Sequence, residues 1–222
     1  MPAAAKVSKE KIINAVLSCS FEKSVGGTSL SDIAGKLGIK KASLYNHYKS
    51  RDEMISDTVK YCGEYLKKIY FIPSDIESIA KKYSAGSVLK AIVNRWFKLN
   101  EKEPLLQINS FLESEKFYSD DVVQIISGQR KKITGQTALT LKKLSEAGKI
   151  IQITDGQALA YAGILSGTMQ ECLSAFIMKK KHEIRCSPDF GEDSLFSSVP
   201  SESSNYNEID RIVLDFCQLL KK

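Results

Sequence analysis

Hydrophobic residues along this chain recur every three to four positions, which is the period of a helix whose one face is buried. In the first such segment, residues 8–23, the apolar stripe consists of Ile12, Ile13, Val16, Leu17 and Phe21. The same spacing predicts further helices over residues 51–70, 87–100, 105–115, 119–147, 154–181 and 206–222. Ser74 and Glu77 have the spacing of a capping box, so a short helix is expected there as well. No alternation of period two lasts long enough for a sheet, and the sequence predicts an all-α fold.

Residues 28–51, TSLSDIAGKLGIKKASLYNHYKSR, predict two short helices joined by a tight turn. Thr28 or Ser29 can cap the first helix by accepting hydrogen bonds from the amides of its first turn. Gly38 follows at the position where a left-handed residue ends a helix at low cost. A second helix is expected over about 41–48. Such a pair of helices is typical of a helix-turn-helix.

The second of these helices carries many exposed hydrogen-bond donors. Residues 36–51 contain five basic residues and no acidic one. Basic side chains bind DNA by neutralising phosphates and releasing counterions. Ser43 and Asn46 are side-chain types that can read base edges in a major groove. We therefore expect a DNA-binding surface; the alternative is a solvated basic face on an ordinary helical hairpin.

The stretches SDIA (31–34), LGI (37–39) and SLYNHYKSRDEM (43–54) closely resemble the N-terminal domain of TetR-type transcriptional repressors. In that family a three-helix domain is followed by a long fourth helix and a helical domain that binds a ligand and dimerises. The resemblance covers residues 8–60. It implies a helix-turn-helix DNA-binding domain over 1–52 and a helical effector-binding and dimerisation domain over 53–222.

The resemblance also implies which side chains touch DNA. The twelve residues that it assigns to DNA are Thr28, Ser29, Ser31, Lys40, Lys41, Ala42, Ser43, Tyr45, Asn46, His47, Lys49 and Arg51. The three hydroxyls at the start of the first helix would contact phosphates, and Lys49 and Arg51 would hold a flanking phosphate. Asn46 would read a base edge, whereas Leu44 and Tyr48 would face inward and support the second helix. The partner implied is double-stranded DNA with a pseudo-palindromic operator.

The last two long helices predict a homodimer. Residues 158–165, ALAYAGIL, are apolar on every side, so one domain core cannot cover them alone. Gly163 and Gly167 would allow another helix to approach closely. TetR-like proteins pair through their last two long helices as a four-helix bundle, and these two helices occupy that place. The alternative is that both are core helices of a monomer.

The resemblance further implies a mostly apolar pocket for a small-molecule effector in the C-terminal helices. Candidate lining residues, each of which could instead be an ordinary core or surface position, are Trp96, Phe97, Asn100, Gln107, Phe111, Tyr161 and Gln170. Binding of the effector would release a repressor from its operator.

Charge and cysteine content add two expectations. The net charge is +6, and residues 1–60 carry ten basic and six acidic residues, hence +4, so the positive charge is concentrated at the amino end. The five cysteines are odd in number and lack a CxxC pair, which argues against a disulfide framework or a zinc site. We expect four of them in the core and treat Cys186, in a polar neighbourhood, as the candidate redox-sensing thiol.

Residues 182–205 are rich in serine and contain two prolines and a glycine, which predicts a flexible loop that exposes His182. No metal site is expected, because there are only two histidines and His47 is assigned to DNA.

Several classes of protein are disfavoured. No apolar run reaches the length of a membrane span and no signal-peptide core is present, so a cytoplasmic protein without membrane contact is expected. The chain has no glycine-rich phosphate loop, HExxH or GxSxG motif, so no enzyme and no cofactor are expected. The sequence predicts a sequence-specific transcriptional regulator. The alternatives are a ligand-independent architectural DNA-binding protein and a thiol-based redox-sensing regulator.

Overall fold

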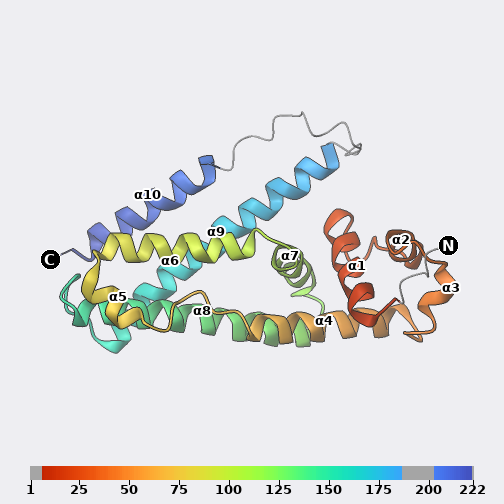
Figure 1. The fold of residues 1–222 in the computed structure, drawn as a ribbon, viewed down its shortest axis with the longest axis horizontal. Coiled ribbons are helices and arrows are strands. Elements are labelled where there is room, and N and C mark those ends of the chain that lie inside the picture. The colour runs from red at the N-terminus through yellow and green to blue at the C-terminus, as the bar shows by residue number, and fades with distance from the viewer. Residues whose placement is uncertain (1–6, 187–202, 222) are drawn as a thin grey trace. The chain divides into compact units, whose positions relative to one another are not determined.

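The computed structural model describes residues 7–186 and 203–221, which form helices and no strand (Figure 1). The chain divides into two compact units, each made of two separate stretches. The first unit comprises Met1–Ile69 and Lys102–Ser127, and the second comprises Tyr70–Glu101 and Gly128–Lys222. The all-α fold predicted from the hydrophobic pattern is confirmed.

The first unit contains α1 (Lys9–Glu22), α2 (Leu30–Lys36), α3 (Lys41–Leu44), α4 (Arg51–Lys67) and α7 (Leu105–Glu115). Helix α1 packs against α2, α4 and α7 and so forms the centre of this unit. Ile12, Val16 and Leu17 of α1 are fully buried, together with Ile33 of α2 and Ile108 of α7. The stripe predicted for the first helix is therefore the core of the unit.

The second unit contains α5 (Ile76–Lys82), α6 (Ala85–Asn100), α9 (Asp155–Cys186) and α10 (Ser203–Leu219). Helix α8 (Asp120–Glu146) begins in the first unit and continues in the second. Helices α6 and α10 pack together, and Asp210 of α10 forms an ion pair with Lys90 of α6 at 2.7 Å and accepts a hydrogen bond from Asn94 of α6 at 3.0 Å. The domain division expected at residue 52 concerns function and stays a prediction.

Most helix ends follow their capping residues. Ser8, Ser29 and Ser50 are the N-caps of α1, α2 and α4, and each side-chain oxygen accepts a hydrogen bond from an amide in the first turn. Gly38 and Gly148 have φ angles of 65° and 70°, so the left-handed conformation predicted at the first of these turns is confirmed.

Two helices of the first unit, α3 and α4, end earlier than the sequence predicts. The helix expected over 41–48 is regular only as far as Leu44, because the next amides bond three residues back, His47 N to Leu44 O at 2.9 Å for example. This tighter turn leads into Ser50, whose extended backbone caps α4. Helix α4 ends at Lys67, three residues before the predicted end.

Helix α5 starts without the capping box expected at Ser74, since Asp75 is the N-cap and makes no capping hydrogen bond.

The loop expected over 182–205 is shorter. Helix α9 extends to Cys186, because Lys180 pairs with Glu183 at 3.3 Å and the half-buried Ile184 continues the apolar face. His182 is exposed as expected, but it lies on this helix. Helix α10 begins at Ser203, and the remaining part of the expected loop, residues 187–202, lies outside the described residues.

Helix α9 exposes several apolar residues, with the charged Glu171 between Ile164 and Met178. Leu159, Ile164 and Met178 are more than half exposed, and a Cβ added at Gly163 or Gly167 would meet no atom within 4 Å. Within the described residues, none of the helices combines the length and apolar character needed to cross a bilayer.

Candidate nucleic-acid interface

Helix α2 is fixed at its start by a reciprocal capping box. Ser29 Oγ accepts a hydrogen bond from Asp32 N at 3.1 Å, and the Asp32 carboxylate accepts one from Ser29 N at 2.8 Å. At its other end, Ile39 N donates to Ala34 O at 3.0 Å across the turn at Gly38. These hydrogen bonds fix both ends of α2 and the turn that leads into α3.

Two ion pairs tie α2 to the end of α1. Lys23 Nζ lies 2.5 Å from Asp32 Oδ1, and Lys36 Nζ lies 2.6 Å from Glu22 Oε1. The hydrogen bond from Lys23, followed by those from Ser29, holds the pKa of Asp32 well below its ordinary value of 3.8. The same bond raises the pKa of Lys23. Both partners are thus held in their charged forms.

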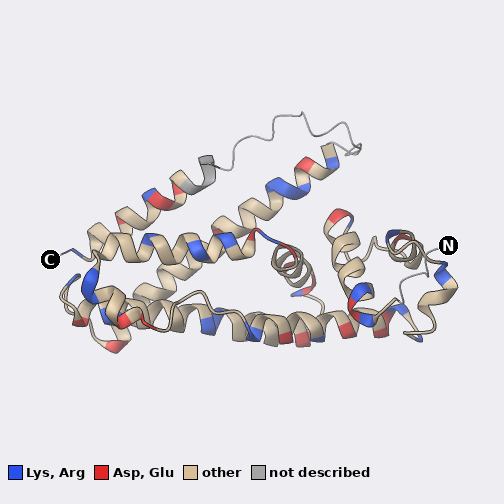
Figure 2. Cartoon of the chain, in the orientation of Figure 1, with Lys and Arg blue, Asp and Glu red and all other residues tan. Residues whose placement is uncertain are grey.

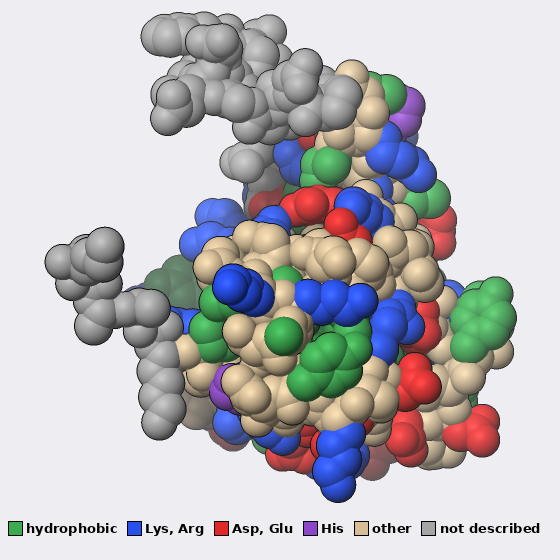
Figure 3. Space-filling view, turned by 90° about the vertical axis from the view of Figure 1, so that its right-hand side faces the viewer, with side chains coloured by type: hydrophobic (Ala, Val, Ile, Leu, Met, Phe, Trp, Pro, Cys, Tyr) green, Lys and Arg blue, Asp and Glu red, His purple; other side chains and the backbone are tan. Residues whose placement is uncertain are grey.

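The segment from Lys40 to Lys49 has two buried anchors and an exposed outer surface. Leu44 and Tyr48 are buried, which confirms their inward orientation. Exposed residues of the segment are Lys40, Lys41, Ala42, Tyr45, Asn46 and Lys49, and Ser43 and His47 are half-buried. Figure 3 looks onto this side and shows lysine and arginine side chains spread among polar and hydrophobic ones. Figure 2 shows that the basic residues of this segment come before α4, whereas the first turn of α4 carries the acidic residues Asp52 and Glu53.

Tyr48 connects this segment to α4 and α1. Its hydroxyl donates to Asp57 Oδ2 of α4 at 2.8 Å, and Lys9 Nζ of α1 lies 4.7 Å from the centre of the Tyr48 ring and 3.7 Å from the same carboxylate oxygen. Burial, reinforced by the bond to Asp57, raises the pKa of Tyr48. The tyrosine is therefore a neutral hydrogen-bond donor that fixes the end of the α3 segment.

Thr28 and Arg51 face into the protein, away from the exposed surface expected for them. Thr28 is only 2% exposed, and its hydroxyl donates to Ser24 O at 2.7 Å. The Arg51 guanidinium donates to Thr28 O at 3.2 Å and to Val25 O. These bonds hold the α1–α2 loop against the start of α4. Sequence reasoning missed this structural role because it depends on two loop carbonyls more than twenty residues away.

The two remaining hydroxyls predicted at the start of α2 are exposed. Ser31 has no side-chain hydrogen bond to a described residue, whereas the Ser29 hydroxyl takes part in the capping box. The structure thus brings ten of the twelve predicted DNA residues to the outer surface of α2, α3 and the turn before α4 and directs Thr28 and Arg51 inward.

The seven predicted effector residues are divided between the two units. Gln107 and Phe111 belong to the first unit, and the other five belong to the second. Asn100 Nδ2 donates to Trp96 O at 2.8 Å, and Gln107 Nε2 donates to Glu103 Oε1 at 2.7 Å, so each amide group bonds to a residue four positions earlier in the chain. Tyr161 and Gln170 are half-buried on α9. The effector assignment stays a prediction.

The cysteines are graded in exposure. Cys19 and Cys62 are buried, Cys172 and Cys217 are half-buried, and Cys186 is exposed. Burial raises the pKa of Cys62 to about 12, which keeps that thiol protonated. Cys186 Sγ lies 3.5 Å from His182 Nε2 one helical turn away. Across the described residues, no three His, Cys, Asp or Glu side chains gather as a metal site would require.

Known proteins are similar to this chain in sequence and in fold. Residues 12–58 match the family model of bacterial regulatory proteins of the tetR family. The negative transcriptional regulator IcaR of the biofilm operon icaADBC, from Staphylococcus aureus, is 28% identical over 142 residues, which is 64% of this chain and 72% of IcaR. IcaR from Staphylococcus epidermidis is 32% identical over 94 residues, 42% of this chain and 48% of that protein.

Two solved structures share the fold at low sequence identity. A TetR transcription regulator from Haloarcula marismortui matches with a TM-score of 0.62 and 10% identity, covering 96% of this chain and 98% of that one. FadR from Bacillus subtilis, solved in complex with stearoyl-CoA, matches with a TM-score of 0.56 and 16% identity, covering 95% and 97%.

Proposed function

The chain is a TetR-type transcriptional regulator, and on that premise we propose that it is a homodimeric repressor that leaves its operator when a small molecule binds. One observation carries this proposal. The segment from Lys40 to Lys49 exposes the hydrogen-bond donors of Lys40, Lys41, Tyr45, Asn46 and Lys49, while Leu44 and Tyr48 anchor it from within. An exposed helix with such side chains suits a major groove.

Within this segment, some residues would contact phosphates and others would contact bases. Lys40, Lys41 and Lys49 are exposed and would contact phosphates, which sets affinity and its dependence on salt. Asn46 is exposed next to Tyr45, whose ring is 53% exposed, and its amide would read a base edge. Arg51 and Thr28 would act indirectly by fixing the loop that supports α2.

Repression is supported by the relatives. IcaR from both staphylococci is described as a negative regulator of the operon icaADBC. A repressor needs only to occupy its operator, so a binding surface without any activating partner suffices. We propose the same mode of action, repression, for the present chain, but we do not propose that it controls the same operon.

Dimerisation is supported by the outward face of α9. Leu159, Ile164 and Met178 are exposed and apolar, and the open surface at Gly163 and Gly167 would let a second α9 approach closely. Exposed apolar residues that recur along one helix face often mark an interaction surface, and here Glu171 is a charged residue among them. A twofold dimer would present two α3 segments to half-sites roughly 34–36 Å apart.

Release by a small molecule is supported by the contacts of α4. Tyr48 joins the end of the α3 segment to Asp57, and Arg51 joins the α1–α2 loop to the start of α4. A movement of α4 would therefore carry the DNA-binding segment with it. FadR, which has this fold, binds stearoyl-CoA, so a protein of this architecture can hold a small ligand.

Selection of bound sequences from a random duplex pool tests the central claim. We expect enrichment of a palindrome with half-site centres about 10 base pairs apart, at roughly 150 mM salt. The double variant Lys40→Ala, Lys41→Ala should lose this enrichment while its circular dichroism spectrum stays that of a folded helical protein. Recovery of unrelated sequences with salt-sensitive binding would contradict a specific repressor and favour the architectural alternative.

The thiol-based alternative depends on Cys186, because it is the exposed cysteine among those described and has an imidazole 3.5 Å away. Loss of operator binding after treatment with hydrogen peroxide, absent from Cys186→Ser, would support this alternative. Equal responses of the two proteins would remove it.

A further inference from the structure

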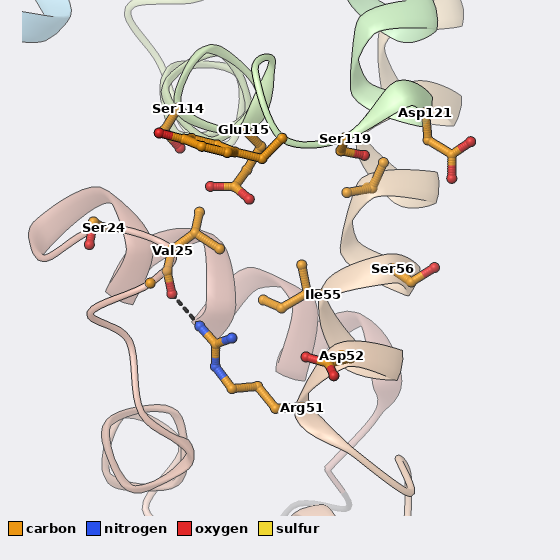
Figure 4. A pocket seen from close by; sticks show the side chains of 13 residues that line it. Ser24, Val25, Arg51, Asp52, Ile55, Ser56, Ser114, Glu115, Ser119 and Asp121 are labelled. Carbon is orange, nitrogen blue, oxygen red and sulfur yellow. Dashed lines mark hydrogen bonds between the residues drawn. The ribbon is translucent and has the colours of Figure 1, made fainter.

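The first unit contains a pocket of about 620 Å³ beside the DNA-binding segment. Its walls come from three places: the α1–α2 loop, the first half of α4, and the end of α7 with the start of α8 (Figure 4). This volume is within the usual range for a site that takes a small organic molecule. None of the seven effector residues predicted from the sequence lines it.

The lining is rich in negative charge. Asp52 of α4, Glu115 of α7 and Asp121 of α8 contribute three carboxylates. No ion pair to any of the three occurs among the described residues. Arg51, the one basic residue of the lining, directs its guanidinium to the carbonyls of Val25 and Thr28. The lining therefore carries three carboxylates against one guanidinium, a net charge of −2, and none of the three carboxylates forms an ion pair with a described residue.

The rest of the lining is apolar or aromatic. Val25 and Ile55 project into the space from the loop and from α4 (Figure 4). Val59 of α4 also belongs to the lining. Tyr118 borders the pocket with a side chain that is 84% exposed, so its ring is accessible to a ligand. An aromatic face attracts a cation, and apolar walls favour a hydrocarbon body.

From this combination we propose that the pocket binds an organic cation with an apolar body and is a site where such a molecule regulates the repressor. Amine groups of the ligand would pair with Asp52, Glu115 and Asp121, and its hydrocarbon part would cover Val25 and Ile55. An anion of the same shape would be repelled by the carboxylates.

The position of the pocket explains how a ligand there would affect DNA binding. Val25 and Arg51 line it, and the hydrogen bond between them connects the loop before α2 to α4. A ligand that contacts both would change the position of that loop relative to α4, and with it the presentation of α3. Only this regulatory step depends on the proposed function; the binding step does not.

Calorimetric titration of the full chain tests binding without DNA. The probe is p-xylylenediamine, a rigid dication, and the matched control is 1,4-phenylenediacetate, which has a similar body with two negative charges. We expect saturable binding of the diamine, weakened several-fold between about 50 and 500 mM salt by screening, and no binding of the diacetate. Equal binding of both probes, or none of the diamine, would overturn the site.

Variants locate the binding. Asp52→Asn with Asp121→Asn should weaken binding of the diamine by roughly three- to tenfold, the loss expected for two exposed ion pairs. Asp120→Asn is the control, because Asp120 is exposed in the same turn as Asp121 but does not line the pocket. Thermal melts show that each variant folds. Unchanged affinity in the double variant would place the ligand elsewhere.

The regulatory role is tested by a separate measurement of operator affinity. The affinity for the selected operator should shift when the diamine is added to wild type, and the double variant should need roughly three- to tenfold more diamine for the same shift. A diamine that binds in the calorimeter without shifting operator affinity would overturn the regulatory role. Failure to find any operator would instead count against the proposed function and leave the binding result standing.

Discussion

Tyr48 and Asp57 lie nine residues apart and are joined by a hydrogen bond of 2.8 Å between the phenol and the carboxylate. The bond connects the residue that closes the α3 segment to the second turn of α4. Lys9 of α1 approaches both partners, so three elements meet at one buried ring. The position of the segment from Lys40 to Lys49 thus depends on a contact that none of its exposed residues makes.

Removing the Tyr48 hydroxyl should weaken this connection. We expect Tyr48→Phe to lower the free energy of unfolding by about 1–2 kcal/mol, because a hydrogen bond to a charged acceptor is lost while the ring stays buried. Urea denaturation measures the change. The control is Tyr45→Phe, at an exposed tyrosine of the same turn, which should unfold like wild type.

Arg51 and Lys49 should separate a structural role from a DNA-contacting one. Arg51→Ala removes two hydrogen bonds to loop carbonyls and should cost about 1–3 kcal/mol of stability, along with DNA affinity. Lys49→Ala should weaken DNA binding and leave the urea midpoint unchanged, since Lys49 is exposed. Equal loss of stability in both variants would contradict the inward role of Arg51.

Phosphate contacts and base contacts should differ in their dependence on salt and sequence. Lys41→Ala should reduce the slope of log affinity against log salt by about 1 and weaken all sequences alike. Asn46→Ala should keep the slope and relax the preference at one base pair, by about 1–3 kcal/mol. Fluorescence anisotropy with the operator and with single-base variants distinguishes the two.

The capping box of α2 predicts a loss of stability in acid. Because Lys23 and Ser29 lower the pKa of Asp32 in the folded protein, the contribution of Asp32 is complete above its ordinary value of 3.8 and is lost as the pH falls through the lower folded-state value. The difference in unfolding free energy between wild type and Asp32→Asn should therefore stay constant from neutral pH to about pH 5 and shrink below about pH 4. A difference that grows in acid would contradict the direction of the shift.

Gly167 gives opposite expectations for the protomer and the dimer. Gly167→Leu should stabilise the isolated helix by up to about 1 kcal/mol, because leucine is the better helix former and no atom lies within 4 Å of an added Cβ. The same side chain should weaken the proposed dimer by blocking close approach of a second α9. Sedimentation velocity over a range of concentrations measures the association. A dimer of unchanged affinity would exclude Gly167 from the interface.

Local signals account for the parts of the fold that were predicted from the sequence. Ser8, Ser29 and Gly38 mark helix ends through interactions that span three to five residues, and the apolar stripe of α1 is visible without knowing its partners. The inward orientation of Leu44 and Tyr48 followed from their spacing of one helical turn.

Long-range contacts account for what the sequence alone missed. Arg51 bonds to carbonyls 23 and 26 residues away, so its role in holding the loop could not be expected from its neighbours in the sequence, whereas its phosphate contact stays a prediction. The end of α3 depends on how Tyr48 meets α4, which lies outside any local window. The pocket lined by Asp52, Glu115 and Asp121 brings the start of α4 together with the junction of α7 and α8, more than sixty residues further along the chain.

The two inward anchors of the α3 segment bear on how such a regulator could acquire a new target during evolution. Leu44 and Tyr48 are buried, while Lys40, Lys41 and Asn46 are exposed and make no contact that the core requires. Substitutions at exposed positions usually change stability by no more than about 0.5 kcal/mol. Descendants of this protein can therefore exchange these side chains one at a time, passing only through folded intermediates, until the preferred DNA sequence has changed.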